Sequence, residues 1–210
     1  MQPREITAVY TPFDEPYLGN EHLRSFDLAI PPAMDANLAV ARRTFGLQMS
    51  PLQKAASEII PQGISIALSI RELVRQAYLY SAGILVRPLV ERTAIVYWLR
   101  DNPKSVMAWH GGWSRKDQPT LEQLLTHLHP GQNNGDLGTF RVMMHKLMHA
   151  DPAGAMYNML QRSDGQCVFP SGKILDDPKM CSFLGIMGEV YLRKLVVAAE
   201  ELFPEGKVAT

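Results

Sequence analysis

Residues 64–99 have the sequence ISIALSIRELVRQAYLYSAGILVRPLVERTAIVYWL, and this stretch decides the fold of the chain. Good helix formers fill it, and apolar side chains occur on most of its sides, as is typical of a buried helix. We interpret the stretch as one long helix. Pro88 predicts a bend in it, because proline removes the hydrogen bond to the carbonyl of Ile84. The sequence therefore predicts an all-α protein built around this helix.

Helical patterns on both sides of the central stretch extend it into a multi-helix bundle. Ser50 followed by Pro51 is typical of a helix start, and the helix that it opens is expected to break or kink at Pro61 and Gly63. Further stop signals, such as Asn102-Pro103, separate the other helices. The predicted flanking helices cover residues 34–48, 51–60, 104–110, 120–129, 136–150, 153–161 and 179–202.

Two segments depart from the helical pattern. Several prolines and glycines interrupt residues 1–32, so we expect an extended N-terminal arm there and a helical domain over residues 33–210. The arm carries several aromatic side chains, which need a surface to cover. Residues 162–177 alternate turn signals with the β-like run QCVF, which predicts a small β-hairpin-like insertion.

The charge of the chain is balanced overall but uneven along its length. The 210 residues include 21 basic and 21 acidic ones, which argues against a general nucleic-acid binder or a membrane-surface protein. Residues 40–116, however, hold 11 basic and 4 acidic side chains, a local charge of +7. Either the acidic outer segments neutralise this basic centre, or the central helices carry a groove for an anion or RNA.

The composition also predicts the cellular location. The start MQPREITAVY has no basic-then-apolar leader, and no uncharged apolar run approaches the roughly 18 residues of a membrane span. Cys167 and Cys181 lack a CxxC pattern, so we expect free thiols in a reducing compartment. We therefore expect a cytoplasmic protein with no membrane contact.

Arg87 and Glu91 are the first candidate site residues. They lie four residues apart and so share one face of the central helix. Inside an apolar segment, two charges need a partner, and they can pair with each other. The pair either fixes helix packing or serves function, with Glu91 as general base or ligand and Arg87 as an anion clamp. If the pair is buried, Glu91→Ala should destabilise the fold by roughly 3–5 kcal/mol.

His145 and His149 form the second candidate group. Their spacing suits one metal ion on a helix, but Lys146 stands where a zinc protease has its catalytic Glu. A site other than a protease would need a third ligand, and spacing does not select one. The candidates for that ligand are Glu91, His110, His127 and His129. The alternative is that one histidine packs near the helix end and the other is exposed, and we expect neither a bound metal nor a cofactor.

Arg141 adds a nuclease alternative. The segment from Arg141 to His149 resembles the signature of the HEPN helical ribonucleases, in which His follows Arg after four to six residues. The spacing departs from that signature, since three residues separate Arg141 from His145 and seven separate it from His149. Arg141 and His145 nevertheless share a helix face, so an RNA-cleaving pair is geometrically consistent.

The motifs YSAGILVRPLVERTAIVYWL and FRVMMHKLMHADP together resemble a family of bacterial proteins with a domain of unknown function. The resemblance covers residues 65–152. It implies an all-helical cytosolic fold without a settled activity, and it makes Arg87, Glu91 and His149 the positions to watch, as one polar cluster between two helices.

These observations lead to two functional hypotheses. The first is a non-enzymatic structural or interaction module, in which Arg87, Glu91 and His149 form a buried polar network and the chain assembles into a homo-oligomer. The second is a hydrolase, either an HEPN-like ribonuclease or a metal-dependent enzyme using His145 or His149. The tryptophans could stack on a flat ligand, but we expect core or rim packing for them. A small-molecule ligand cannot be named from the sequence.

Overall fold

Seven helices make up most of the described chain. The computed structural model describes residues 13–45, 48–114, 116–148, 159–161, 164–168 and 172–204. The helices in these residues are α1 (Glu21–Thr44), α2 (Pro51–Arg75), α3 (Leu79–Asp101), α4 (Pro103–His110), α5 (Leu121–Leu128), α6 (Asn134–Met148) and α8 (Pro178–Leu202). The prediction of an all-α bundle is confirmed. None of these helices is long and apolar enough to cross a membrane.

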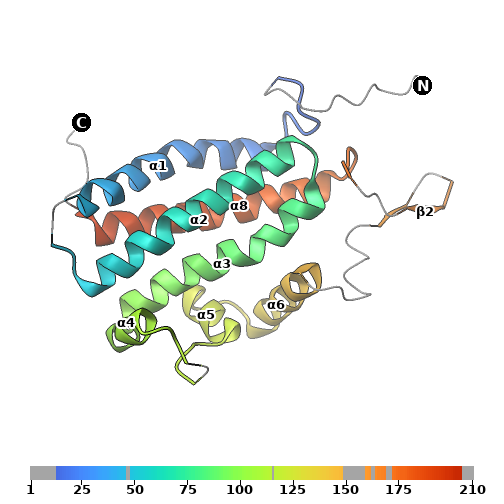
Figure 1. Cartoon of the computed structure of the whole chain (residues 1–210). Helices are drawn as coiled ribbons and strands as arrows, with labels where there is room; N and C mark the ends of the chain where they lie inside the picture. Colours follow the sequence, from blue (N-terminus) through green and yellow to red (C-terminus); the bar gives the residue numbers. More distant parts are fainter. Residues whose placement is uncertain are drawn as a thin grey trace.

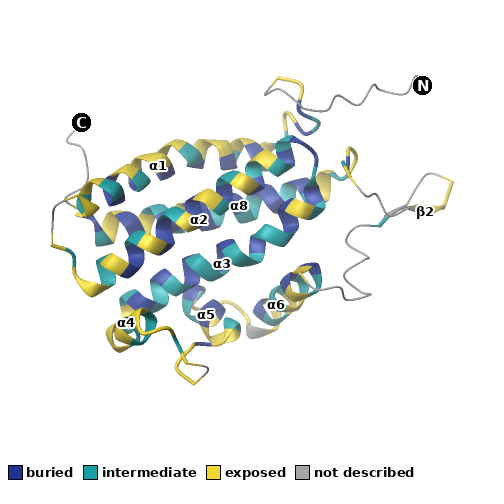
Figure 2. Cartoon of the chain, viewed as in Figure 1, coloured by how far each residue is buried: buried dark blue, intermediate teal, exposed yellow. Residues whose placement is uncertain are grey.

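The long helices form the body of the molecule, and the short ones cover one side of it. Helices α1, α2, α3 and α8 run side by side, with α1 packed on α8 and α2 on α3 (Figure 1). Helices α5 and α6 pack against α3, and α4 contacts both α2 and α3. Buried faces of the helices turn inward, and exposed side chains gather on the outside (Figure 2). Helix α3 is therefore the long helix that α4, α5 and α6 all contact.

Helix α1 corrects the predicted start of the helical part. We expected an extended chain as far as residue 32, but α1 begins at Glu21 and continues through Pro31 and Pro32. The helix tolerates the two prolines because its buried face, which includes Phe26 and Ala29, keeps the helical spacing across them. Asn20 caps its first turn by accepting hydrogen bonds from the backbone N–H groups of residues 22 and 23. Within the described residues, the non-helical start is therefore only residues 13–20.

The central stretch is two helices rather than one. Helix α2 runs through Pro61 and Gly63, where we expected a break or kink, and the chain turns instead at residues 76–78. Ala77 has φ +64°, a left-handed conformation that is uncommon outside glycine. Its carbonyl accepts a hydrogen bond from the N–H of Ile174 at 2.8 Å, and its side chain is buried. Tertiary contacts therefore hold a turn at a position without glycine or proline.

Several predicted helix boundaries are confirmed. Ser50 caps α2, and its side chain and that of Gln53 form a reciprocal capping box with the backbone. Thr120 and Gln123 form the same arrangement at the start of α5. Helix α3 ends at Asp101, where the Asn-Pro signal predicted an end. The predicted helix at residues 153–161 falls mostly outside the described residues.

The segment before α8 contains a very short β pairing. Strand β1 (Leu160–Gln161) pairs antiparallel with β2 (Cys167–Val168) over two residues each. A pairing this short leaves the domain all-α, and the described part of residues 162–177 shows no larger β-hairpin-like insertion of the kind that we expected. The two cysteines are free thiols, with Cys167 exposed and Cys181 buried in α8.

Candidate functional site

A cleft lies where α3, α5 and α6 meet, and we call it the cationic cleft. Its volume is about 330 Å³. Three side chains that can carry a positive charge at neutral pH line it together with a histidine and two apolar residues. The lining residues are Arg87, Leu121, Arg141, Val142, His145 and Lys146. Three of the five predicted site residues therefore come together here, from two different helices.

Helical spacing explains how the cleft acquires these side chains. On α6, residues 141, 142, 145 and 146 stand at positions i, i+1, i+4 and i+5, which form one broad face. Residues Leu137 and Met144 of α6 are buried and fix how the helix packs. On α3, Arg87 lies beside Val86 and Leu89, both buried in the core. Each charged side chain thus extends from a helix that its apolar neighbours hold in place.

The Arg87–Glu91 ion pair forms as its spacing predicts. The Arg87 Nε donates to Glu91 Oε1 at 2.8 Å. The side chains of Arg87 and Glu91 are 22% and 29% exposed, so the pair is only partly buried. The expectation of a buried network is therefore wrong for these two residues. The loss of 3–5 kcal/mol for Glu91→Ala was expected only for a buried pair, and the partial exposure favours a smaller loss because solvent can stabilise the unpaired charge.

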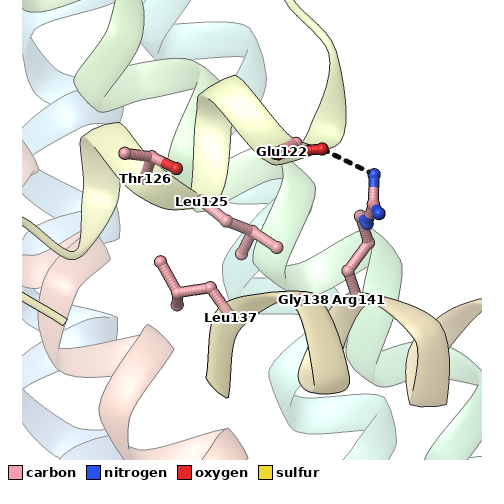
Figure 3. A pocket seen from close by; sticks show the side chains of 6 residues that line it. All are labelled: Glu122, Leu125, Thr126, Leu137, Gly138 and Arg141. Atoms are coloured by element: carbon pink, nitrogen blue, oxygen red, sulfur yellow. Dashed lines mark hydrogen bonds and ion pairs between the residues drawn. The ribbon is translucent and has the colours of Figure 1, made fainter. Parts of the chain in front are cut away.

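Arg141 bridges α6 and α5. Its Nη1 donates to Glu122 Oε2 at 2.8 Å, and both side chains are exposed. Figure 3 shows this ion pair above a small hollow whose walls include Leu125, Leu137 and Gly138. The hollow has a volume of only about 20 Å³, so it has room for little more than a water molecule. Arg141 therefore lines both this hollow and the cationic cleft.

The two arginines retain most of their hydrogen-bonding capacity. A guanidinium group carries five N–H donors in a planar fork that matches carboxylate and phosphate groups. Within the described residues, Arg87 donates one hydrogen bond to a protein group and Arg141 also donates one. Lys146 adds a third cation in the same cleft. The cleft can therefore bind an anion through several charge-assisted hydrogen bonds.

The histidines have different positions from those that a metal site requires. His145 lines the cationic cleft, whereas His149 lies outside the described residues. His110, His127 and His129 have separate partners, which are the carbonyl of Pro51, the carboxylate of Asp101 and the hydroxyl of Tyr191. Across the part of the chain that the structure describes, no three His, Cys, Asp or Glu side chains gather as metal ligands would. The metal-dependent alternative therefore has no ligand set among those residues.

Sequence reasoning missed two residues of this site. Lys146 appeared in it only as a substitution in a protease motif, although its place beside His145 on an amphipathic helix could have identified it. Glu122 gave no such signal, because its role depends on how α5 packs against α6. Helical periodicity does not show which helices face each other, because that depends on tertiary packing.

Comparisons with models of protein families, with curated proteins and with solved structures find no match to this chain. The family resemblance over residues 65–152 therefore has no support beyond the all-helical fold that it implied.

Proposed function

We propose that the protein binds an anionic ligand in the cationic cleft. The single observation that carries this proposal is the meeting of Arg87, Arg141 and Lys146 in one cleft, with most of the arginine donors not used by protein groups among the described residues. Guanidinium groups bind phosphate and carboxylate groups through charge-assisted hydrogen bonds of defined geometry. The nearby carboxylates of Glu91 and Glu122 hold the arginines in position until an anion competes for them.

Titration calorimetry with pyrophosphate tests this proposal. Arg87→Gln and Arg141→Gln should each weaken binding by about tenfold or more, since a hydrogen bond to a charged group contributes about 1.5–3 kcal/mol. Glu91→Gln and Glu122→Gln should strengthen binding, because each removes a carboxylate that competes with the ligand. Binding should also weaken as the salt concentration rises.

Arg193→Gln is the matched control for these variants. Arg193 lies on α8 and binds Glu189 through the same atoms, Nε and Oε1, at 2.9 Å and at the same four-residue spacing. This substitution removes an equal charge away from the cleft. Equal losses of affinity in Arg193→Gln and Arg87→Gln would mean that pyrophosphate responds only to net charge, which contradicts a specific site.

The ribonuclease hypothesis uses the same cleft. Arg141 and His145 lie one turn apart on α6, and both line it. An imidazole beside a bound phosphodiester could act as general acid or base. We propose this only as an extension of anion binding. A cleavage assay with single-stranded RNA tests it, because His145→Gln should abolish cleavage while pyrophosphate binding persists.

We also propose that the chain self-associates through α1, as the interaction hypothesis expects. Three large apolar side chains are exposed along this helix, namely Leu28, Met34 and Leu38, and a fourth, Phe45, is exposed at its C-cap. The first turn of α1 is acidic, with Glu21, and its last turn is basic, with Arg42 and Arg43. An antiparallel pairing of two copies would place the basic end of one helix over the acidic start of the other. Charge complementarity and apolar contact therefore both favour a second copy as the partner.

Sedimentation equilibrium tests the self-association. Leu38→Asp should shift the protein to monomer, because it places a charge in the centre of the apolar face. Met107→Asp is the control, since Met107 is also apolar and exposed but lies on α4. A monomer at every concentration of the unmodified protein would contradict this proposal.

A further inference from the structure

A second and larger cleft lies beside the cationic cleft. We call it the tryptophan cleft, and its volume is about 550 Å³. One aromatic ring from α3 lines it together with polar side chains at the start of α5 and along that helix. Its lining residues are Trp98, Thr120, Glu122, Gln123, Thr126 and His127. A flat ring with amide and hydroxyl groups around it is suited to a ligand that both stacks and forms hydrogen bonds.

Hydrogen bonds hold the aromatic wall of this cleft in place. The Trp98 Nε1 donates to Ser105 Oγ at 3.3 Å, and the ring meets His127 edge to face at 5.4 Å between centroids. The His127 Nε2 lies 2.9 Å from the Asp101 carboxylate, which also accepts hydrogen bonds from Arg100. The hydrogen bond from Arg100 is the main cause that keeps the pKa of Asp101 below its ordinary value, and the hydrogen bond from His127 lowers this pKa further. The stacking surface is therefore preorganised.

The two clefts border each other, and the ion pair between Glu122 and Arg141 links their linings. Thr120 and Glu122 line the tryptophan cleft, whereas Leu121, between them in the chain, lines the cationic cleft. Glu122 also forms the ion pair with Arg141, which lines the cationic cleft (Figure 3). Because both side chains of this pair are exposed, 68% for Glu122 and 43% for Arg141, a ligand can cross it. One ligand can thus contact both clefts.

The spacing along α3 gives the length of such a ligand. Arg87 and Trp98 are eleven residues apart, or about three turns, so they lie on one face of the helix. At the helical rise of ~1.5 Å per residue this separation is roughly 16 Å. A single phosphate attached to a nucleoside is too close to its base to reach both ends. A chain of phosphates extends far enough from the base to do so.

We infer that the two clefts together bind a nucleoside polyphosphate, with the base in the tryptophan cleft and the phosphate chain in the cationic cleft. This inference rests on the proposed anion-binding function and names its ligand class. The base would stack on Trp98, and the amide of Gln123 and the hydroxyl of Thr126 would meet its polar edge. The phosphates would displace Glu122 from Arg141 and extend toward Arg87.

Comparing ATP with tripolyphosphate separates the inference from the proposal beneath it. Both should bind the unmodified protein in titration calorimetry, and ATP should bind about tenfold more tightly because its base stacks. Trp98→Leu should remove this advantage while the affinity for tripolyphosphate stays unchanged. Trp98→Phe should restore most of the advantage, because it returns an aromatic face. Arg87→Gln should weaken both ligands, whereas the control Arg193→Gln should weaken neither.

Each remaining outcome has a distinct meaning. Equal affinities for ATP and tripolyphosphate would overturn the inference and leave the anion-binding proposal intact. Binding of neither ligand would overturn both. A single-stranded oligonucleotide that binds far more tightly than ATP would overturn the nucleoside polyphosphate in favour of a nucleic-acid ligand. Unchanged ATP affinity in Trp98→Leu, with the fold intact by circular dichroism, would also overturn the placement of the base.

Discussion

Arg71 and Arg87 lie on consecutive helices of the central stretch, yet their surroundings differ sharply. Arg71 of α2 donates four hydrogen bonds, two to Glu15 and two to Asp27. Its side chain is 12% exposed and that of Glu15 only 4%. Among the described residues, Arg87 donates one hydrogen bond, to Glu91, and it borders an open cleft. One arginine is enclosed by protein groups, whereas the other has donors left for a ligand.

The difference shows how a charge inside an apolar stretch can be structural or functional. Burial alone would lower the pKa of Arg71, but hydrogen bonds from its guanidinium to Asp27 and Glu15 raise it overall. The same end of the bundle is tied by Tyr17, whose hydroxyl donates to the carbonyl of Ile174 at 2.6 Å. Burial raises the pKa of Tyr17 to about 12, so this hydroxyl stays protonated as a donor at neutral pH. We call the cluster of Glu15, Asp27 and Arg71 the sealed network.

The largest expected effect comes from breaking the sealed network. Arg71→Met should lower the free energy of unfolding by about 3–5 kcal/mol, because it leaves the buried carboxylate of Glu15 without its partner. Urea denaturation followed by circular dichroism measures this loss. Asp27→Asn, which alters the more exposed partner, provides a milder variant if Arg71→Met does not fold. A loss under about 1 kcal/mol for Arg71→Met would contradict the contrast with Arg87.

A smaller change in the free energy of unfolding is expected when the Arg87–Glu91 pair is broken. Glu91→Ala should lower the free energy of unfolding by at most about 1 kcal/mol, since its ion pair with Arg87 is partly exposed. Glu189→Ala is the matched control, because Glu189 pairs with Arg193 at the same spacing on α8. Similar small losses in both variants would support an open pair. A loss of 3 kcal/mol or more in Glu91→Ala alone would show that the pair is buried in solution.

The sequence predicted the helices better than it predicted their limits. Local capping signals at Ser50 and at Asn102-Pro103 gave the right boundaries because the physical cause lies within a few residues. We expected Pro31 to lie in an extended arm and Pro61 to break or kink a helix, but packing of the buried faces maintains both helices through these prolines. The turn at Ala77 depends on a hydrogen bond from a residue about a hundred positions away, and no local pattern contains that information.

Only part of the candidate site was predicted, because local spacing again carries no information on tertiary contacts. Helical spacing correctly placed Arg87 beside Glu91, and Arg141 on one face with His145. It could not show that α3 and α6 bring these two faces into one cleft, nor that Glu122 of α5 pairs with Arg141. His149, the third member of the expected network, lies outside the described residues. Whether a charged pair is sealed or open is decided by packing between helices.

The smallest effect that we expect concerns a second partly enclosed group, His129, and it appears in the pH dependence of stability. The His129 Nε2 lies 3.0 Å from the Tyr191 hydroxyl, and burial, with a lesser contribution from Lys194, lowers the pKa of His129 below 6.5. At pH values above about 6.5 the imidazole is neutral in both states, so its contribution to stability is complete. As the pH falls toward the lowered pKa, only the unfolded chain takes up the proton, and the free energy of unfolding decreases. Below that pKa the loss stops, because both states are protonated.

His129→Gln isolates this effect, because glutamine keeps a group that can hydrogen-bond Tyr191 but does not titrate. Denaturation curves between pH 7.5 and pH 5 should show a steeper loss of stability in the unmodified protein than in the variant. All other titrating groups are common to both proteins and cancel in the difference between the two curves. Equal slopes would mean that solvent reaches His129 freely. In that case the contact of His129 with Tyr191 of α8 would count as an open region of the molecule, as the two clefts do.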